Sequence, residues 1–164
     1  MTAEELNERS PVDVQHAIMA RPLSLRIHPD PILRSVCHPV ERFDGWLSNV
    51  LDEMLSLMRL NRGIGLAAPQ VGIAKRFFVA QIGRQPLRFV NPMIVARSGS
   101  GRLAEGCLSL PEVSVNVQRD LQIEVEGFDA RGQRRRHALE GLWARVAQHE
   151  IDHLDGILIC DHER

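Results

Sequence analysis

The sequence lacks an excess of charge of either sign. Its 164 residues include 20 lysines and arginines and 21 aspartates and glutamates. This balance excludes a global electrostatic attraction to nucleic acid or to an anionic membrane. The basic cluster Arg134-Arg135-Arg136 is local and typical of a solvated strand or turn. We therefore expect neither nucleic acid nor a membrane as a direct partner.

Long apolar runs and a cysteine framework are also missing. No segment approaches the roughly 20 apolar residues that a membrane-spanning helix needs. The first residues, MTAEELNERSPVDV, are too acidic for an organellar transit peptide and lack the apolar stretch of a secretory signal. The three cysteines, Cys37, Cys107 and Cys160, are an odd and sparse set, which favours a reducing compartment over disulfide bonding. These absences predict a cytoplasmic protein.

The periodicity of apolar residues predicts a single α+β domain. Residues 1–20 read as a polar N-terminal extension, and residues 21–164 are long enough to form one core. Helical spacing begins at Asp44, a plausible N-cap, and stops at Asn61. Helical spacing returns from Leu142 to His153, and Gly156 stands where a C-terminal cap would. Between the two helices lie short strand-like runs at 76–82, 87–95, 113–119 and 121–128, and the last of them is followed by a predicted hairpin to 133–140.

The segment QHEIDHLDG contains the pattern His-Glu-x-x-His. His149 and His153 are four residues apart, so on a helix both imidazoles project from one face and can share a metal ion. Glu150 lies beside them, where it can handle the proton of a water without being a ligand. A chance match on an ordinary buried helix is the alternative, but two histidines and a glutamate at this spacing favour the metal.

A metal held by two histidines needs at least one further protein ligand. The metzincin pattern requires a histidine where this sequence has Ile159, and a downstream glutamate could come only from Glu163. Upstream, Cys107 in EGCLSLP is the best candidate, because thiolate binds borderline metals strongly. A free cysteine is more often a small buried apolar residue, so the residues alone leave both interpretations of Cys107 open.

The glycine-rich segment GIGLAAPQVG also has two interpretations. Its Gly63-x-Gly65-x-x-Ala68 spacing superficially fits a dinucleotide-binding fingerprint, which requires a strand before it and a helix after it. Here a helix precedes the segment, and Pro69 and Gly72 interrupt any helix after it. The segment is either a glycine turn or a stretch of backbone that comes close to an extended ligand.

Together, GIGLAAPQVG, EGCLSLP and QHEIDHLDG resemble the three signature motifs of the peptide deformylase family, in the same order and with similar separations. HPDPILR is similar to the start of that fold, so the resemblance covers roughly residues 21–161. It implies antiparallel β-sheets packed around a central metal-binding helix. It also implies a hydrolase of protein biosynthesis that removes the N-formyl group from N-formylmethionine at the start of new polypeptides and releases formate.

The resemblance implies one divalent metal ion, held by Cys107, His149 and His153. Ferrous iron is the usual ion of the family, and zinc, nickel and cobalt are the alternatives. The motif glutamate, Glu150, would take a proton from water and pass it to the leaving amine. The Gln70 side-chain amide and the Leu108 backbone N–H would stabilise the developing oxyanion.

For the substrate, the resemblance implies three contact residues. Gly65 maps to the loop that pairs with the extended peptide, and Ile64 and Leu142 are expected in the wall of the methionine pocket. Glu105 is a candidate to orient a ligand imidazole, with a surface carboxylate as the alternative. One departure is Ser114, which stands where some relatives carry an arginine, so peptide binding near the pocket is expected to differ.

Two alternatives to the deformylase interpretation stay open. The protein could be a metallopeptidase or another amidase that uses the same ion, or a catalytically silent deformylase-like module that binds N-terminal peptides. The expected partners are N-formylmethionyl nascent peptides and, transiently, the ribosome. Many bacterial members continue into a C-terminal helix, whereas this sequence stops at CDHER, so ribosome docking by such a tail is not expected.

Overall fold

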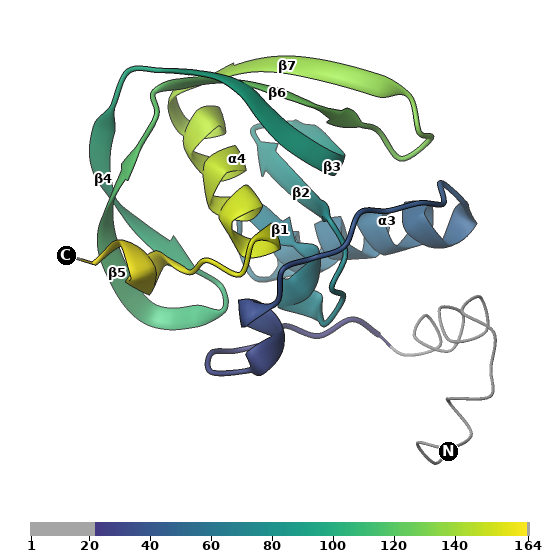
Figure 1. Cartoon of the computed structure of the whole chain (residues 1–164). Helices are drawn as coiled ribbons and strands as arrows, with labels where there is room; N and C mark the ends of the chain where they lie inside the picture. The colour runs from purple at the N-terminus through teal and green to yellow at the C-terminus, as the bar shows by residue number, and fades with distance from the viewer. Residues whose placement is uncertain (1–21, 164) are drawn as a thin grey trace.

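The computed structural model describes residues 22–163, so the polar extension predicted for residues 1–20 lies outside the described residues. These residues fold as one α+β domain of antiparallel strands and two α-helices, as the sequence predicts (Figure 1). Within this part of the chain, no helix has the length and apolar character needed to cross a membrane. In chain order the elements are η1 (Pro31–Arg34), α3 (Gly45–Leu60), β1 (Gly65–Ala67), η2 (Ala68–Val71), β2 (Phe77–Ile82), β3 (Gln85–Ser98), β4 (Gly101–Cys107), β5 (Leu110–Arg119), β6 (Gln122–Phe128), β7 (Arg134–Glu140), α4 (Gly141–Leu154) and η3 (Ile159–His162).

Helix α3 confirms the first predicted helix. Asp44 is its N-cap, because the Asp44 Oδ1 atom accepts a hydrogen bond from the Leu47 N–H at 3.1 Å. The helix ends at Leu60, and Asn61 is its C-cap. Its apolar stripe is buried in a core shared with β1 and β2, and consists of Leu47, Val50, Leu51, Met54, Leu55 and Met58. This core fixes the position of β1, the strand beside the candidate site.

Five strands form an antiparallel sheet in the order β1-β2-β3-β6-β7. The predicted hairpin is present, since β6 pairs with β7 from Gln122↔Glu140 to Phe128↔Arg134. Ile123 and Val125 are buried, as their alternation predicts, whereas Leu121 precedes the strand and is half exposed. β1 lies at one edge of the sheet, and among the described residues it pairs with β2 alone.

Strands β4 and β5 form a separate two-stranded sheet, joined by the two-residue turn Leu108-Ser109. The sequence predicted β5 but neither β4 nor β1. β4 was missed because its segment GRLAEGC has two glycines and an exposed leucine, Leu103, so it carries no apolar alternation. β1 was missed because it is short and begins at Gly65 in the glycine-rich segment.

Helix α4 lies between the five-stranded sheet and the β4–β5 hairpin (Figure 1). Its apolar side is buried against the sheet, in a cluster with Phe78, Ile123 and Val125. The helix ends at Leu154, and Gly156 adopts the left-handed conformation at φ +73°. A Cβ at Gly156 would come within 2.6 Å of a backbone oxygen, so glycine is required there, in agreement with the predicted cap.

Candidate metal centre

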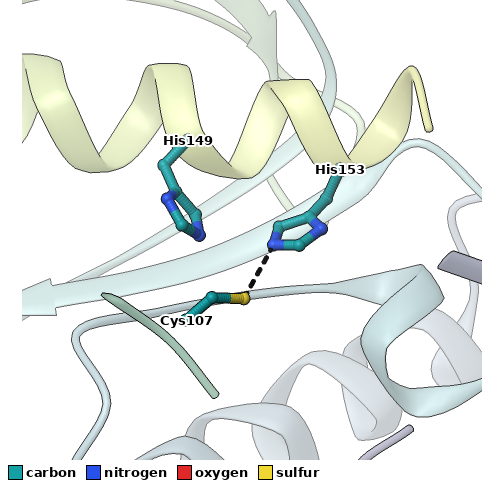
Figure 2. A group of neighbouring side chains, drawn as sticks. All are labelled: Cys107, His149 and His153. Atoms are coloured by element: carbon teal, nitrogen blue, oxygen red, sulfur yellow. Dashed lines mark hydrogen bonds between the residues drawn. The ribbon is translucent and has the colours of Figure 1, made fainter. Parts of the chain in front are cut away.

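Three side chains from two elements place potential metal-binding atoms close together. His149 and His153 project from α4, and Cys107 at the end of β4 faces them (Figure 2). One ligand atom from each residue lies within 4.8 Å of the others, and the Cys107 Sγ atom is 3.3 Å from the His153 Nε2 atom. Sulfur and nitrogen ligands of one tetrahedral ion are separated by about 3.5 Å, given bond lengths of about 2.3 and 2.0 Å. The donor set therefore fits a single ion.

A buried carboxylate fixes the ring of His149. The His149 Nδ1 atom lies 2.9 Å from the Glu105 Oε1 atom, so the other ring nitrogen, Nε2, faces the candidate ion. Such a contact sets the tautomer and the orientation of a ligand histidine. Of the two roles that the sequence allows for Glu105, the surface carboxylate is wrong, because only 8% of the residue is exposed.

Two buried arginines hold Glu105 in turn. The Arg119 Nε and Nη2 atoms donate to the two Glu105 carboxylate oxygens at 3.0 and 2.9 Å. The Arg145 Nη1 atom donates to Glu105 at 2.6 Å, and Arg145 also bonds the Val117 and Gly101 carbonyls. Burial alone would raise the pKa of Glu105, but the hydrogen bonds from His149 and Arg119 and the charge of Arg119 outweigh it. The pKa of Glu105 is therefore held well below its usual value, and the carboxylate stays ionised.

Sequence reasoning missed Arg119 and Arg145, although each leaves a signal. Arg119 continues the buried alternation of Val115 and Val117, so it occupies an inward-facing strand position. Arg145 lies four residues before His149 and therefore on the same face of α4. A charged residue at an inward-facing position requires a partner of opposite charge, and Glu105 provides it.

Glu150 is buried without such support. It is 3% exposed, and its Oε2 atom has no hydrogen-bond partner among the described residues. Burial raises the pKa of Glu150 to about 7, against the opposing charges of His149 and Arg119. A carboxyl group with a pKa near neutrality can both accept and donate a proton, as a general acid–base group must.

Gly65 in β1 leaves the space that the Glu150 carboxylate occupies. A Cβ at Gly65 would lie 2.4 Å from the Glu150 Oε1 atom and 2.9 Å from the Val146 side chain. The backbone of β1 therefore approaches the carboxylate more closely than any other residue type would allow. Gly63 is similarly constrained, since its Cβ would lie 2.7 Å from the Leu108 side chain.

Gln70 is a buried residue next to Cys107. It is 1% exposed, and its Oε1 atom accepts a hydrogen bond from the Ala67 N–H at 2.9 Å. This contact leaves the Gln70 Nε2 atom to face Ser109 Oγ at 3.1 Å and Cys107 Sγ at 3.6 Å. The amide is therefore fixed with its donor end toward the candidate metal centre.

The surroundings of His153 favour its neutral form. Burial and the charge of His149 lower the pKa of His153 well below its usual value. Its Nδ1 atom has no hydrogen-bond partner among the described residues, and its Nε2 atom faces Cys107. A neutral imidazole is the form that binds a metal.

A cavity of about 450 Å³ opens onto these residues. All six catalytic and substrate-binding residues expected from the sequence line it, and so do Cys107 and His149. Ile64 and Leu142 are 43% and 52% exposed, so they lie toward solvent rather than deep in the wall. The six residues are Glu150, Gln70, Leu108, Ile64, Gly65 and Leu142.

The other two cysteines lie outside this group. Cys37 is 3% exposed and belongs to the core under α4, and burial raises the pKa of its thiol to about 11. Cys160 packs against a third core formed by η1, β5 and η3. Neither belongs to a group of potential ligands among residues 22–163.

Comparisons with known proteins give a consistent result. The polypeptide deformylase family model matches residues 22–164. The peptide deformylase of Thermotoga neapolitana is 44% identical over 138 residues, which are 84% of each chain. That of Caldicellulosiruptor bescii is 47% identical over 137 residues, 84% of this chain and 82% of the relative. The crystal structure of peptide deformylase from Thermotoga maritima is similar with a TM-score of 0.85 at 41% identity, covering 88% of this chain and 99% of that one.

Proposed function

The chain belongs to the peptide deformylase family and removes the N-formyl group from newly made polypeptides, and we propose that it does so at a metal ion held by Cys107, His149 and His153. The observation that carries this proposal is the convergence of one thiol and two imidazoles beside a buried carboxyl, Glu150, that has no partner for its Oε2 atom among the described residues. Helix α4 is then the metal-binding helix around which the sheets pack. We propose ferrous iron as the ion.

A divalent ion at this position supplies Lewis acidity, which lowers the pKa of water and polarises a carbonyl oxygen. Glu150 accepts the proton of the attacking water, because its pKa lies near neutrality and it borders the cavity. The same carboxyl then donates the proton to the amine of the departing peptide. Gln70, held by the Ala67 N–H, donates a hydrogen bond to the oxyanion, and the backbone N–H of Leu108 is the proposed second donor.

The substrate lies along the open edge of β1. An extended peptide that pairs with the Ile64–Gly65 backbone adds a strand to the sheet, which is a common mode of peptide recognition. Its methionine side chain enters the cavity between Ile64 and Leu142, and its formyl end reaches Glu150 next to Gly65. Because the substrate is a nascent chain, we also propose transient contact with the ribosome.

The metal assignment is tested by removing each thiol in turn. Cys107→Ala should lose most of the bound metal, because the site loses one of its three protein ligands. Cys37→Ala and Cys160→Ala should keep the metal, since neither thiol belongs to the ligand group. Metal content per chain, measured after anaerobic preparation with ferrous iron, is the readout. Equal metal content in all three variants would reject the assignment.

The reaction is tested on three matched substrates. A formyl carbon carries only hydrogen, so it enters a site too narrow for the methyl of an acetyl group or for an internal peptide bond. Formate should therefore be released from formylmethionyl peptides, acetylated peptides should react much more slowly, and internal bonds should stay intact. Comparable rates on all three would favour a general amidase or peptidase. Binding of formylated peptide without formate release, with iron or nickel restored, would favour a silent binding module.

A further inference from the structure

Three residues other than glycine adopt the left-handed backbone conformation among residues 22–163: Arg62 at φ 58°, Asn91 at φ 50° and Glu112 at φ 63°. This conformation is costly for arginine and glutamate but tolerated by asparagine. Asn91 also has a local reason, since its side chain bonds the Val40 N–H and C=O at 2.8 and 2.9 Å. Arg62 and Glu112 have no such bond within the described residues, yet both line the cavity of the metal centre.

Arg62 occupies a position where helices usually have glycine. The Gly63 N–H bonds the Met58 carbonyl at 2.9 Å and the Arg62 N–H bonds the Arg59 carbonyl at 3.0 Å, which together form a Schellman motif at the end of α3. The residue in the left-handed position of this motif is most often glycine, because it has no Cβ. Strain kept at the rim of a cavity is a reason to look for a function of the side chain.

The position of Arg62 along the substrate path is set by the backbone. Gly65 borders Glu150, where the formyl group would lie, and Arg62 is three residues before Gly65. Even a fully extended chain advances only about 3.3 Å per residue, so these three residues span at most about 10 Å. A peptide whose formyl end lies at Gly65 and which extends toward the C-terminal end of α3 therefore comes within reach of Arg62 with its second to fourth residue.

Glu112 stands on the other wall of the cavity. It belongs to β5, in a segment where the pairs Glu105↔Val115 and Cys107↔Leu110 enclose one residue of β4 and four residues of β5. This bulge carries Glu112 out of the regular ladder. Glu112 and Arg62 are both exposed, and within residues 22–163 neither forms an ion pair. The cavity therefore has one cation and one anion toward solvent, on walls built from different elements.

We propose that Arg62 and Glu112 select charged residues behind the formylmethionine. On this proposal, which rests on the deformylase function above, the preferred nascent chains carry an acidic side chain at the position that faces Arg62. They carry a basic side chain at the position that faces Glu112. Consecutive side chains of an extended peptide point to opposite sides, so the two selected positions are neighbours among the second to fourth residues.

The experiment scans charge along the substrate. Formylmethionyl peptides with Asp, Asn or Lys at the second, third or fourth position are assayed by formate release with the metal-loaded wild type. At one position kcat/KM should be about two- to fivefold higher for Asp than for Lys, and at a neighbouring position the order should be reversed, as is typical of exposed charge pairs. Both preferences should shrink in concentrated salt, because exposed charges are screened.

Variants then assign each preference to its residue. Arg62→Glu should reverse only the acidic preference, and Glu112→Lys only the basic one. Arg62→Gly should abolish the acidic preference while the melting temperature stays equal or rises, since glycine relieves the left-handed backbone. Arg59→Glu is the matched control, because it changes the same charge one turn earlier, on a residue that does not line the cavity, and it should keep the wild-type preferences.

The outcomes separate this proposal from the function on which it rests. Formate release with equal kcat/KM for Asp, Asn and Lys at all three positions would overturn charge selection and leave the deformylase activity intact. Preferences that survive Arg62→Glu and Glu112→Lys would overturn the assignment to these residues. Absence of formate from every peptide would overturn the proposed function and the selection together.

Discussion

Two buried glutamates lie beside His149 in opposite electrostatic surroundings. Glu105, on the β4–β5 hairpin, is 8% exposed and accepts hydrogen bonds from two arginines. Glu150, on α4, is 3% exposed and has a carboxylate oxygen without any partner among the described residues. The pKa of Glu105 is held low by His149 and Arg119 against the effect of burial, whereas burial raises the pKa of Glu150 to about 7.

The difference shows how one residue type takes two roles at one site. A buried carboxylate with all its partners is fixed in charge and position, so it can orient His149 but cannot exchange protons near neutral pH. A buried carboxyl without partners is poised to exchange protons. The fold creates both conditions locally. Strand β5 brings Arg119 to Glu105, whereas Gly65 in β1 brings uncharged backbone against Glu150.

The largest predicted effect concerns proton transfer. Glu150→Gln keeps the shape of the side chain but removes its basicity, so turnover should fall by roughly 10²–10⁴-fold, the range of general acid–base catalysis. Bound metal should be retained, because Glu150 is not in the ligand group. Formate release and metal content are measured on the same anaerobic preparation. Near-normal turnover would remove Glu150 from the mechanism and erase the contrast with Glu105.

The second prediction concerns support for the ligand. Glu105→Gln leaves two buried arginines without their shared anion, so the free energy of unfolding should fall by about 3–5 kcal/mol. Metal affinity should fall about 10–100-fold, as is usual when the partner of a ligand histidine is lost. Denaturant unfolding and competition with a chelator measure the two quantities. Glu41→Gln, on an exposed glutamate, is the control and should change neither. An unchanged metal affinity in Glu105→Gln would reject the supporting role.

The contrast also shows which features the sequence could predict. His149, Glu150 and His153 lie within one helical turn, so local periodicity alone places them on α4. The position of Cys107 depends on the folding back of β4 from a distant part of the chain, and only the resemblance to a known family predicted it as a metal ligand. The two arginines around Glu105 were missed for the same reason, since Arg119 meets Glu105 through a pairing between strands.

Backbone details limited the fold prediction in a similar way. Helix α3 and the β6–β7 hairpin were predicted because their apolar spacing and turn residues are local signals. Strand β4 is stabilised by its ladder with β5. Such pairing produces no local sequence pattern in a segment that has two glycines and an exposed leucine, Leu103. The left-handed conformation of Arg62 could not be expected either, because glycine is the usual residue in that position.

The smallest predicted effect concerns how protein stability depends on pH, measured on chelator-treated protein. Glu150→Gln and Glu105→Gln should change this stability in opposite directions. The pKa of Glu150 is about 7 in the folded chain, above the value of about 4.3 expected in the unfolded chain. The folded state therefore binds more protons, and stability falls as the pH rises from about 4 to about 7. Glu150→Gln lacks this loss and should be more stable than the wild type by on the order of 2 kcal/mol at about pH 8. At about pH 4.5 its advantage should nearly disappear.

For Glu105 the sign is opposite. Its pKa is lowered by folding, so its contribution to stability is present above the unfolded value of about 4.3 and is lost only as the pH falls through the folded value. Glu105→Gln should therefore be less stable than the wild type at about pH 8, by an amount that shrinks in acid. Denaturant unfolding of the three metal-free proteins at the two pH values tests both signs. If both glutamine variants shifted stability in the same direction at about pH 8, the two carboxyls would not differ as their surroundings require.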